Sequence, residues 1–255
     1  MSDFYYVNQL IKRCKVEMKI SLNNWLKNIQ WLNYNNLAQR IFKQNCLLCA
    51  SSQGNNHALC EACLKELPYS PATSCPQCGL SSNGLICGAC INSPPDFDAT
   101  HAVFLYAFPV DAMMQRYKYG DALHISRTFG ELLAEKVNID FVDLIIPMPM
   151  HPARLKTRGF NQALEIAKVF SKEKLDYKSA IRQKLTPPQA SLPFKERVKN
   201  IKGAFTINVN LAGKRVAIID DVMTTGASLN ELAKILKKAG AVHVECWVVA
   251  RTLPH

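Results

Sequence analysis

The thirteen-residue segment VAIIDDVMTTGAS, from Val216 to Ser228, constrains the fold of this chain more than any other. Its first part belongs to the short apolar, β-branched run Arg215–Ile219, which is typical of a parallel strand buried on both faces. Asp220 and Asp221 come next, at the carboxyl end of that strand, where the ligands of open α/β sheets bind. We therefore predict an α/β fold with a parallel sheet, and a ligand site that includes this carboxylate pair.

The residues after the two acids predict a phosphate site at the start of a helix. Apolar residues recur at helical spacing from Leu229 to Leu236, and Gly240 follows as a stop signal. Small hydroxyl residues and a glycine precede this helix, and their N–H and O–H groups can converge on an anion that the helix dipole also favours. The predicted phosphate-binding residues are Thr224, Thr225, Gly226, Ala227 and Ser228.

Carboxylates beside a phosphate site indicate a sugar phosphate as the ligand. The phosphate would bind at the helix start, while Asp220 and Asp221 would accept hydrogen bonds from ribose hydroxyls. A nucleoside triphosphate or a dinucleotide fits less well, because the sequence lacks the glycine and lysine spacing of a P-loop and the GxGxxG pattern. A tight turn with an aspartate cap is the alternative without a ligand, and it does not account for two adjacent acids.

Eight of the ten cysteines form four C-x-x-C pairs, and these predict two structural zinc sites. Two residues between thiolates let both sulfurs reach one metal ion, and two such pairs complete a tetrahedral sulfur shell. Sequence order favours one zinc for the first two pairs and one for the last two, although an interleaved arrangement is also open. The predicted zinc ligands are Cys46, Cys49, Cys60, Cys63, Cys75, Cys78, Cys87 and Cys90.

Other interpretations of the cysteines fit the sequence less well. Disulfides require an oxidising compartment, whereas the chain shows no signal-peptide pattern and no apolar stretch as long as a membrane span, so we expect a cytoplasmic protein. Thioredoxin-like chemistry uses a single C-x-x-C pair. His57 could replace one thiolate but is expected to be a loop residue, and Cys246, within the apolar run Val244–Ala250, is expected to be a buried core thiol.

The sequence divides into three parts. Residues 1–42 are a polar, asparagine-rich lead of unassigned role, residues 43–93 hold the zinc ribbons, and residues 98–255 form the α/β domain. Ser93, Pro94 and Pro95 act as the linker. In the last part, expected strands alternate with expected helices, with the Val216 strand near the sheet centre. The expected strands are Ala99–Phe108 and Phe141–Ile146, and the expected helices include Met113–Tyr117, His124–Val137 and Gly159–Lys172.

Basic charge is concentrated in one stretch of the chain. The formal net charge is +11, and between His151 and Lys202 there are thirteen Lys and Arg residues against four acidic ones. Such a balance indicates an anionic partner or substrate. A solvated basic face, or a disordered basic loop, remains the alternative for any of these residues taken alone.

Three motifs in order resemble one known family. The nine residues from Asp220 to Ser228, DDVMTTGAS, match the signature by which type I phosphoribosyltransferases bind 5-phosphoribosyl-1-pyrophosphate (PRPP). With IIPMPMHPARLKTRGFNQA, the segment Arg182–Phe205 and the preceding C-x-x-C pairs, the chain resembles the ComF family from about Cys46 to Arg251. The resemblance implies a type I phosphoribosyltransferase domain, preceded by a zinc-ribbon module, that binds PRPP with magnesium. It also implies a role in natural competence.

The resemblance also assigns further site residues. It places Arg158 and the RGFNQ element to Gln162 beside a pyrophosphate-binding loop, and it makes Arg182–Lys202 a basic loop that closes over the site. The implied reaction is attack at the anomeric carbon of the sugar while pyrophosphate leaves, with Asp220, Asp221 and Arg158 as the catalytic set. The implied pyrophosphate loop is Met148, Pro149, Met150 and His151, and the basic-loop positions that match the family pattern are Thr186, Gln189, Arg197 and Asn200.

Two functions of different class follow from this sequence. The first is the handling of single-stranded DNA during DNA uptake in natural transformation, with other competence proteins as further partners. In this function Phe160, Phe194 or Tyr117 would stack on bases if exposed, whereas packing in the core is the alternative for aromatic residues of an α/β domain. The alternative is an active phosphoribosyltransferase of nucleotide metabolism, whose acceptor is unidentified because no nucleobase-specific hood is evident. The candidate DNA-binding residues are Arg154, Lys156, Arg158, Lys195, Arg197, Lys199 and Lys202.

Overall fold

The computed structural model describes residues 45–52, 58–119, 123–185 and 200–253, and the chain divides into two units between Cys60 and Glu61. The second unit contains every helix and strand described below. Its helices are α3 (Glu61–Lys65), α4 (Gly88–Asn92), α5 (Val110–Tyr119), α6 (Ile125–Lys136), α7 (Pro152–Arg158), α8 (Gln162–Ala167) and α10 (Ala227–Lys238). None of the helices in the described ranges is both long and apolar enough to cross a membrane.

A four-stranded parallel sheet organises the second unit, in the order β1-β6-β5-β2. The strand predicted from the apolar run after Lys214 is therefore central, with a parallel neighbour on each side. Its side chains from Val216 to Ile219 are completely buried, as expected for a strand covered on both faces. The strands of this sheet are β1 (Ala99–Leu105), β2 (Leu144–Pro147), β5 (Arg215–Met223) and β6 (His243–Arg251).

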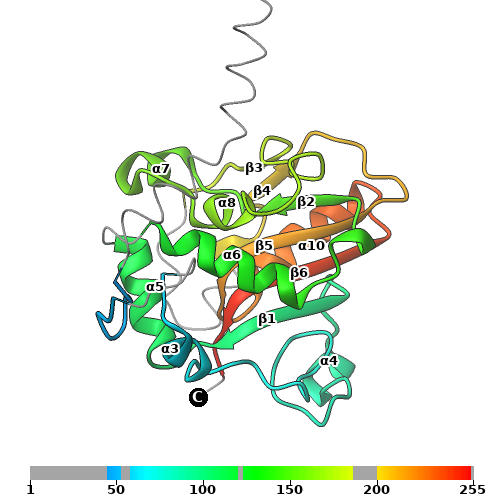
Figure 1. Ribbon diagram of the computed structural model, residues 1–255. Coiled ribbons are helices and arrows are strands. Elements are labelled where there is room, and N and C mark those ends of the chain that lie inside the picture. Colours follow the sequence, from blue (N-terminus) through cyan, green and yellow to red (C-terminus); the bar gives the residue numbers. More distant parts are fainter. Residues whose placement is uncertain (1–44, 53–57, 120–122, 186–199, 254–255) are drawn as a thin grey trace, which may run out of the picture. The chain divides into compact units, whose positions relative to one another are not determined.

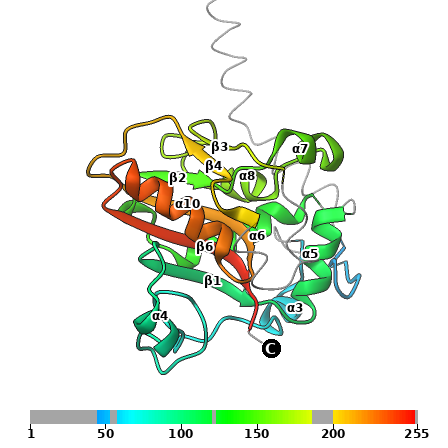
Figure 2. The ribbon, with the colours of Figure 1, turned by 180° about the vertical axis from the view of Figure 1, so that it is seen from behind.

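Helices cover both faces of the sheet. Helices α6 and α8 lie on one face (Figure 1), and α10 lies on the opposite face (Figure 2). The apolar stripe of α10, which includes Leu229, Leu232 and Leu236, is buried against β5 and β6. Strands β3 (Ala180–Arg182) and β4 (Phe205–Ile207) form a separate antiparallel pair beside α10. This parallel α/β arrangement confirms the predicted fold class.

The strand expected over Ala99–Phe108 ends at Leu105, and two other predicted elements also differ from the structure. The strand expected from Phe141 begins only at Leu144, because residues Ile139–Phe141 form a short 3₁₀ helix (η1) whose start is capped by the Asn138 side chain. The helix expected over Gly159–Lys172 is also shorter. Gly159 has a φ of 84° and ends α7, and Asn161 then caps the new helix α8. In both places a local side-chain cap overrides the apolar pattern.

Candidate functional site

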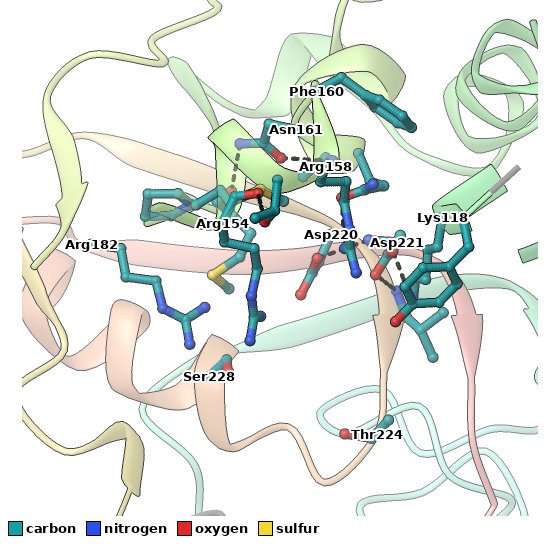
Figure 3. A pocket seen from close by; sticks show the side chains of 18 of the residues that line it. Lys118, Arg154, Arg158, Phe160, Asn161, Arg182, Asp220, Asp221, Thr224 and Ser228 are labelled. Carbon is teal, nitrogen blue, oxygen red and sulfur yellow. Dashed lines mark hydrogen bonds and ion pairs between the residues drawn. The ribbon is translucent and has the colours of Figure 1, made fainter. Parts of the chain in front are cut away.

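A cavity of about 670 Å³ opens where the sheet presents the carboxyl ends of β2 and β5 (Figure 3). Elements from distant parts of the sequence meet there: α5, the loop after β2, α7, the start of α8, β3, and the end of β5 with the start of α10. This is the position at which ligands bind in open α/β sheets. Both acids of the DDVMTTGAS segment line it.

The two acids are held by the strand itself and by a lysine from α5. Strand β5 continues through both of them to Met223, so the two acids lie within the last residues of the strand and not after its end. The backbone N–H of Asp221 donates to Asp220 Oδ1 at 2.9 Å, and Lys118 Nζ lies 3.0 Å from Asp221 Oδ2. Burial favours the neutral amine of Lys118, but the Asp221 carboxylate raises its pKa, so the ammonium form persists.

The surroundings of Asp220 disfavour the ionised form of its carboxyl group. Burial, followed by the neighbouring Asp221 charge, raises its pKa from 3.8 to about 7, although Lys118 and Arg182 act in the opposite direction. An unfolded chain releases this proton near pH 4, whereas the folded chain keeps it until about pH 7. The free energy of unfolding therefore falls as the pH rises through that window.

We expect Asp220→Asn to stabilise the ligand-free protein above pH 7. The amide cannot ionise, so the melting temperature at pH 8 should rise by roughly 5 °C relative to wild type, and the difference should shrink as the pH is lowered to 5.5. Asp221→Asn is the matched control and should destabilise instead, because it leaves Lys118 without its carboxylate partner. Thermal unfolding across this pH range tests both. Equal changes in the two variants would contradict this account of the pair.

The predicted phosphate-binding segment turns sharply at Gly226. Its φ of 77° is in the left-handed region, and a Cβ there would come within 2.8 Å of Met223 Cε. The backbone N–H of Ala227 donates to Thr225 Oγ1 at 3.3 Å, which closes the turn before α10. Thr224 and Ser228 line the cavity, whereas Thr225, Gly226 and Ala227 form the turn without lining it.

The loop after β2 forms another wall of the cavity. Met148, Pro149 and Met150 line it as predicted for a pyrophosphate loop, but His151 does not. Instead, the His151 ring accepts a hydrogen bond from the backbone N–H of Ala153 at 3.1 Å and caps the start of α7. Asn161 Nδ2 donates to the Met148 carbonyl at 3.1 Å, so the RGFNQ element does lie against this loop.

Three arginines bring positive charge to the cavity. Arg154 and Arg158 come from α7, and Arg182 comes from β3; in Figure 3 the guanidinium groups of Arg154 and Arg182 point toward Ser228. Burial and then the charge of Arg154 lower the pKa of Arg182. Arg158 donates to Gln162 Oε1 at 3.1 Å, and its guanidinium lies 5.0 Å from the centre of the Tyr119 ring. Like charges gathered in a partly buried wall favour an anion between them.

A buried amide also faces this cavity. Gln162 is 2% exposed and lines the cavity, and its Nε2 has no hydrogen-bond acceptor among the described residues. A buried N–H donor without an acceptor costs free energy that a ligand oxygen would recover. The Gln162 side chain is therefore a second feature, besides the arginines, that fits an anionic ligand.

Several lining residues had no signal in the sequence. Lys118 contacts Asp221 across more than one hundred residues, and Arg182 stood only at the edge of the expected basic loop. Tyr106 and Tyr119 also line the cavity, and with Phe160 of the RGFNQ element, which the resemblance had placed beside the site, they give the cavity an aromatic component. The only hint in the sequence was the helical pattern around Tyr117, which also brings Lys118 to the inner side of α5. Most of the expected basic loop, residues 186–199, lies outside the described residues and includes Thr186, Gln189 and Arg197. Asn200 is described and partly buried.

The candidate DNA-binding residues separate into different environments. Lys156 is exposed on α7, whereas Arg154 and Arg158 turn into the cavity, and Lys202 is exposed beyond the loop. Tyr117 follows the core-packing alternative and does not stack on bases, because it is fully buried and its hydroxyl donates to the Gln162 carbonyl at 2.8 Å. Phe160 is partly exposed and packs against the Tyr117 ring at 5.7 Å. Lys195, Arg197, Lys199 and Phe194 lie outside the described residues.

The cysteines form two groups of four in sequential order, as the favoured pairing predicted, and they are not interleaved. Within each group all Sγ atoms lie within 4.8 Å of one another, which fits a tetrahedral sulfur shell, and none of the described cysteines forms a disulfide. Although burial opposes ionisation, backbone N–H groups lower the pKa of Cys75 to about 7, whereas burial raises the pKa of Cys78 and of Cys90 in the ligand-free group. Cys246 is fully buried, as expected, and His57 lies outside the described residues. The first group is Cys46, Cys49, Cys60 and Cys63, and the second group is Cys75, Cys78, Cys87 and Cys90.

Comparisons with known proteins match both the segment with the cysteine groups and the domain that contains the cavity. Residues 37–91 match the double zinc ribbon domain family, and residues 155–253 match the phosphoribosyl transferase domain family. The chain is 33% identical over 230 residues to competence protein F of Haemophilus influenzae, covering 82% of this chain and 98% of that protein. It is 30% identical over 221 residues to the DNA utilization protein YhgH of Escherichia coli O6:H1, covering 82% and 97%. It is 25% identical over 228 residues to competence protein ComFC of Streptococcus pneumoniae, covering 81% and 99%.

Proposed function

This chain belongs to the competence protein F (ComF) family, and from that premise we propose that it binds PRPP with magnesium and takes part in handling single-stranded DNA during DNA uptake in natural transformation. In this proposal the zinc ribbons occupy residues 43–93, the phosphoribosyltransferase domain occupies residues 98–255, and the protein acts in the cytoplasm. The names of its relatives, which refer to competence and DNA utilization, support the cellular role.

One observation carries the ligand assignment: a carboxylate pair, arginines, and the two hydroxyl residues that flank the glycine turn, Thr224 and Ser228, line a single cavity. The cavity provides hydrogen-bond acceptors for ribose hydroxyls at Asp220 and Asp221. It provides donors for phosphate at Thr224 and Ser228, and the Arg154 guanidinium points toward Ser228 (Figure 3). A sugar that bears phosphate groups needs both the acceptors and the donors. An acyclic anion would need only the donors.

The donor set also fits magnesium brought in with the ligand. Mg²⁺ keeps several waters and binds through one or two carboxylates together with substrate phosphates, and Asp220 and Asp221 are the carboxylates of the described lining. When bound, the ion would neutralise charge on the pyrophosphate. Asp220 accepts a stronger hydrogen bond from a ribose hydroxyl when it is ionised, and a positive ion nearby would lower its raised pKa toward that state.

The cellular part of the proposal is tested by a transformation assay. In a naturally transformable host that carries this chain as its ComF protein, Asp220→Ala/Asp221→Ala should reduce transformation to the level of a deletion if PRPP binding matters to DNA uptake. Asp143→Ala is a matched control, because Asp143 binds the backbone N–H of Arg215 at the opposite end of β5. Normal transformation by the double-acid variant, at equal protein level, would show that DNA uptake does not need the two carboxylates, and it would contradict this part of the proposal.

Binding to single-stranded DNA should depend on salt and on the exposed face of α7. A fluorescently labelled single strand is expected to bind at low salt and to lose affinity as salt rises, because each phosphate contact releases counterions. Lys156→Gln should weaken binding and reduce the salt slope by about 1 without changing PRPP affinity, since Lys156 does not line the cavity. Lys136→Gln, at the exposed end of α6, is the control. No binding at low salt would contradict the DNA part of the proposal.

The aromatic residues of the cavity favour a second candidate function, phosphoribosyl transfer to an acceptor. Tyr106, Tyr119 and Phe160 offer a surface on which a planar acceptor could stack beside the sugar. In such a reaction the acceptor would attack the anomeric carbon and the pyrophosphate would leave, with the arginines stabilising its charge. Release of pyrophosphate from PRPP only in the presence of an added base or nucleoside would support this enzyme. If PRPP binds but none of these acceptors supports turnover, the result would favour DNA handling over phosphoribosyl transfer.

A further inference from the structure

One buried arginine connects the second cysteine group to the phosphate-binding segment. Arg251 is the last residue of β6 and is 4% exposed. Its Nε donates to the carbonyl of Cys78 at 2.9 Å, while its Nη1 donates to the carbonyl of Met223 at 3.0 Å and also contacts the carbonyl of Thr224. A single rigid guanidinium group therefore touches a zinc-ligand residue and the two residues that begin the phosphate-binding turn.

The second cysteine group is itself fixed to the sheet edge. Thr100 of β1 donates from its hydroxyl to the Gln77 carbonyl at 2.6 Å and from its backbone N–H to the Pro76 carbonyl at 2.9 Å. Gly79 has a φ of 70°, and a Cβ there would lie 3.0 Å from Thr100 Cγ2. This close docking means that a change in the cysteine knuckle is transmitted to the sheet and to Arg251, since the packed elements leave little space for independent movement.

The charge of Arg251 requires a counterpart. Within the described residues Arg251 forms no ion pair with a carboxylate, and its recorded partners are backbone carbonyls. A buried charge without an opposite charge is costly. Four thiolates around one zinc ion carry a net charge of −2, and Arg251 contacts the residue that supplies one of these thiolates. The second cysteine group, when it holds zinc, is therefore suited to balance the guanidinium.

The contacts of Arg251 also set the direction of the peptide groups in the phosphate-binding turn. In a trans peptide unit the C=O and N–H groups point in opposite directions. Because the carbonyls of Met223 and Thr224 face the guanidinium, the N–H groups of Thr224 and Thr225 point away from it. Arg251 thus holds the backbone N–H groups of Thr224 and Thr225 in one orientation.

We propose that Arg251 is a positioning residue through which zinc binding at the second cysteine group sets the affinity of the phosphate-binding segment for its ligand. The proposal rests on the proposed PRPP site, but its first test does not use PRPP. Zinc at this group holds the guanidinium, and the guanidinium holds the turn that begins with Met223. Loss of either partner leaves the donors of Thr224 and Thr225 free to reorient.

Hydrogen exchange of the backbone amides of residues 224–228 tests the connection directly in the full chain. Cys87→Ser removes one ligand from the second cysteine group and should raise exchange in this segment. Arg251→Met should raise it with both zinc ions retained, and adding Cys87→Ser to Arg251→Met should raise it little further. Cys49→Ser, in the first cysteine group, and Arg215→Met, at the opposite end of β5, are matched controls that should leave exchange at the wild-type level.

PRPP affinity gives the second readout. Calorimetry should show at least about tenfold weaker binding by Arg251→Met. Arg251→Lys should lose less affinity, because it keeps the charge but not the planar set of guanidinium donors. Arg215→Met should bind as the wild type does. Wild-type exchange rates or wild-type affinity in zinc-loaded Arg251→Met would overturn the proposal. If Arg251→Met does not fold, Arg251→Lys and Cys87→Ser still decide it by exchange. If the wild-type chain binds no PRPP, the proposed function fails, and the exchange experiment alone decides the role of Arg251.

Discussion

Replacing both Asp220 and Asp221 by alanine is expected to weaken PRPP binding by a factor of at least about 100, because hydrogen bonds to charged groups contribute roughly 1.5–3 kcal/mol each. Both carboxylates line the cavity, together with Thr224 and Ser228 of the predicted phosphate-binding segment and with the loop after β2. The variant gains stability by losing the buried Asp220 carboxyl and loses stability because Lys118 is left without its carboxylate partner, so its thermal unfolding is measured beside the titration. Calorimetric titration of zinc-loaded protein with PRPP and Mg²⁺ measures the effect.

Asp143→Ala controls for the loss of a carboxylate elsewhere on the sheet. Asp143 accepts a hydrogen bond from the backbone N–H of Arg215 at 2.8 Å, at the start of β5 and away from the cavity. It should bind PRPP as the wild type does. Equal affinity of the wild type and the double-acid variant would refute the role assigned to the pair. A loss in Asp143→Ala as large as in the double variant would point to general destabilisation instead.

Removal of one zinc ligand from the second cysteine group is expected to have the second largest effect. Cys75 is 1% exposed and packs with the other three thiols of its group. Cys75→Ser should lower the zinc content from two ions per chain to one and lower the melting temperature by roughly 10 °C, since structural zinc contributes several kcal/mol to folding. Metal analysis and thermal unfolding on the same sample measure both quantities.

Cys246→Ala is the matched control for the loss of a buried thiol. Cys246 is fully buried in β6 but belongs to neither cysteine group. Its replacement should leave two zinc ions per chain and cost only the packing of one small side chain, about 1–2 kcal/mol. Fewer than two zinc ions in the wild type, or an unchanged zinc content in Cys75→Ser, would contradict the assignment of the two groups.

The part of the site that is contiguous in the chain, from Asp220 to Ser228, could be predicted from sequence because local sequence signals define each of its elements. The strand ending in Asp220 and Asp221, the glycine turn and helix α10 all depend on local signals: β-branched burial, a left-handed glycine and apolar spacing. The cysteine groups follow the same logic, since two residues between thiols fix each knuckle. The central place of β5 also followed, because strands alternating with helices build a parallel sheet around the most buried strand.

The remaining parts of the site depend on tertiary contacts that no local pattern encodes. Lys118 reaches Asp221 from α5, and Arg251 reaches Cys78 across 173 positions. Tyr117 illustrates the opposite error. Its aromatic ring suggested a stacking surface, but helical spacing places it inward against Phe129, while the next residue, Lys118, faces the cavity. A one-residue difference in helix phase, 100°, therefore separates a core side chain from a site side chain.

Titration of the zinc-loaded wild-type chain with PRPP in the presence of Mg²⁺ tests the central claim most directly. The cavity at the end of β5 predicts saturable binding of one PRPP per chain, weaker binding of ribose 5-phosphate, which lacks the pyrophosphate, and no comparable binding of ATP. Absence of saturable PRPP binding by folded protein that carries both zinc ions, or equal binding of ATP, would contradict it.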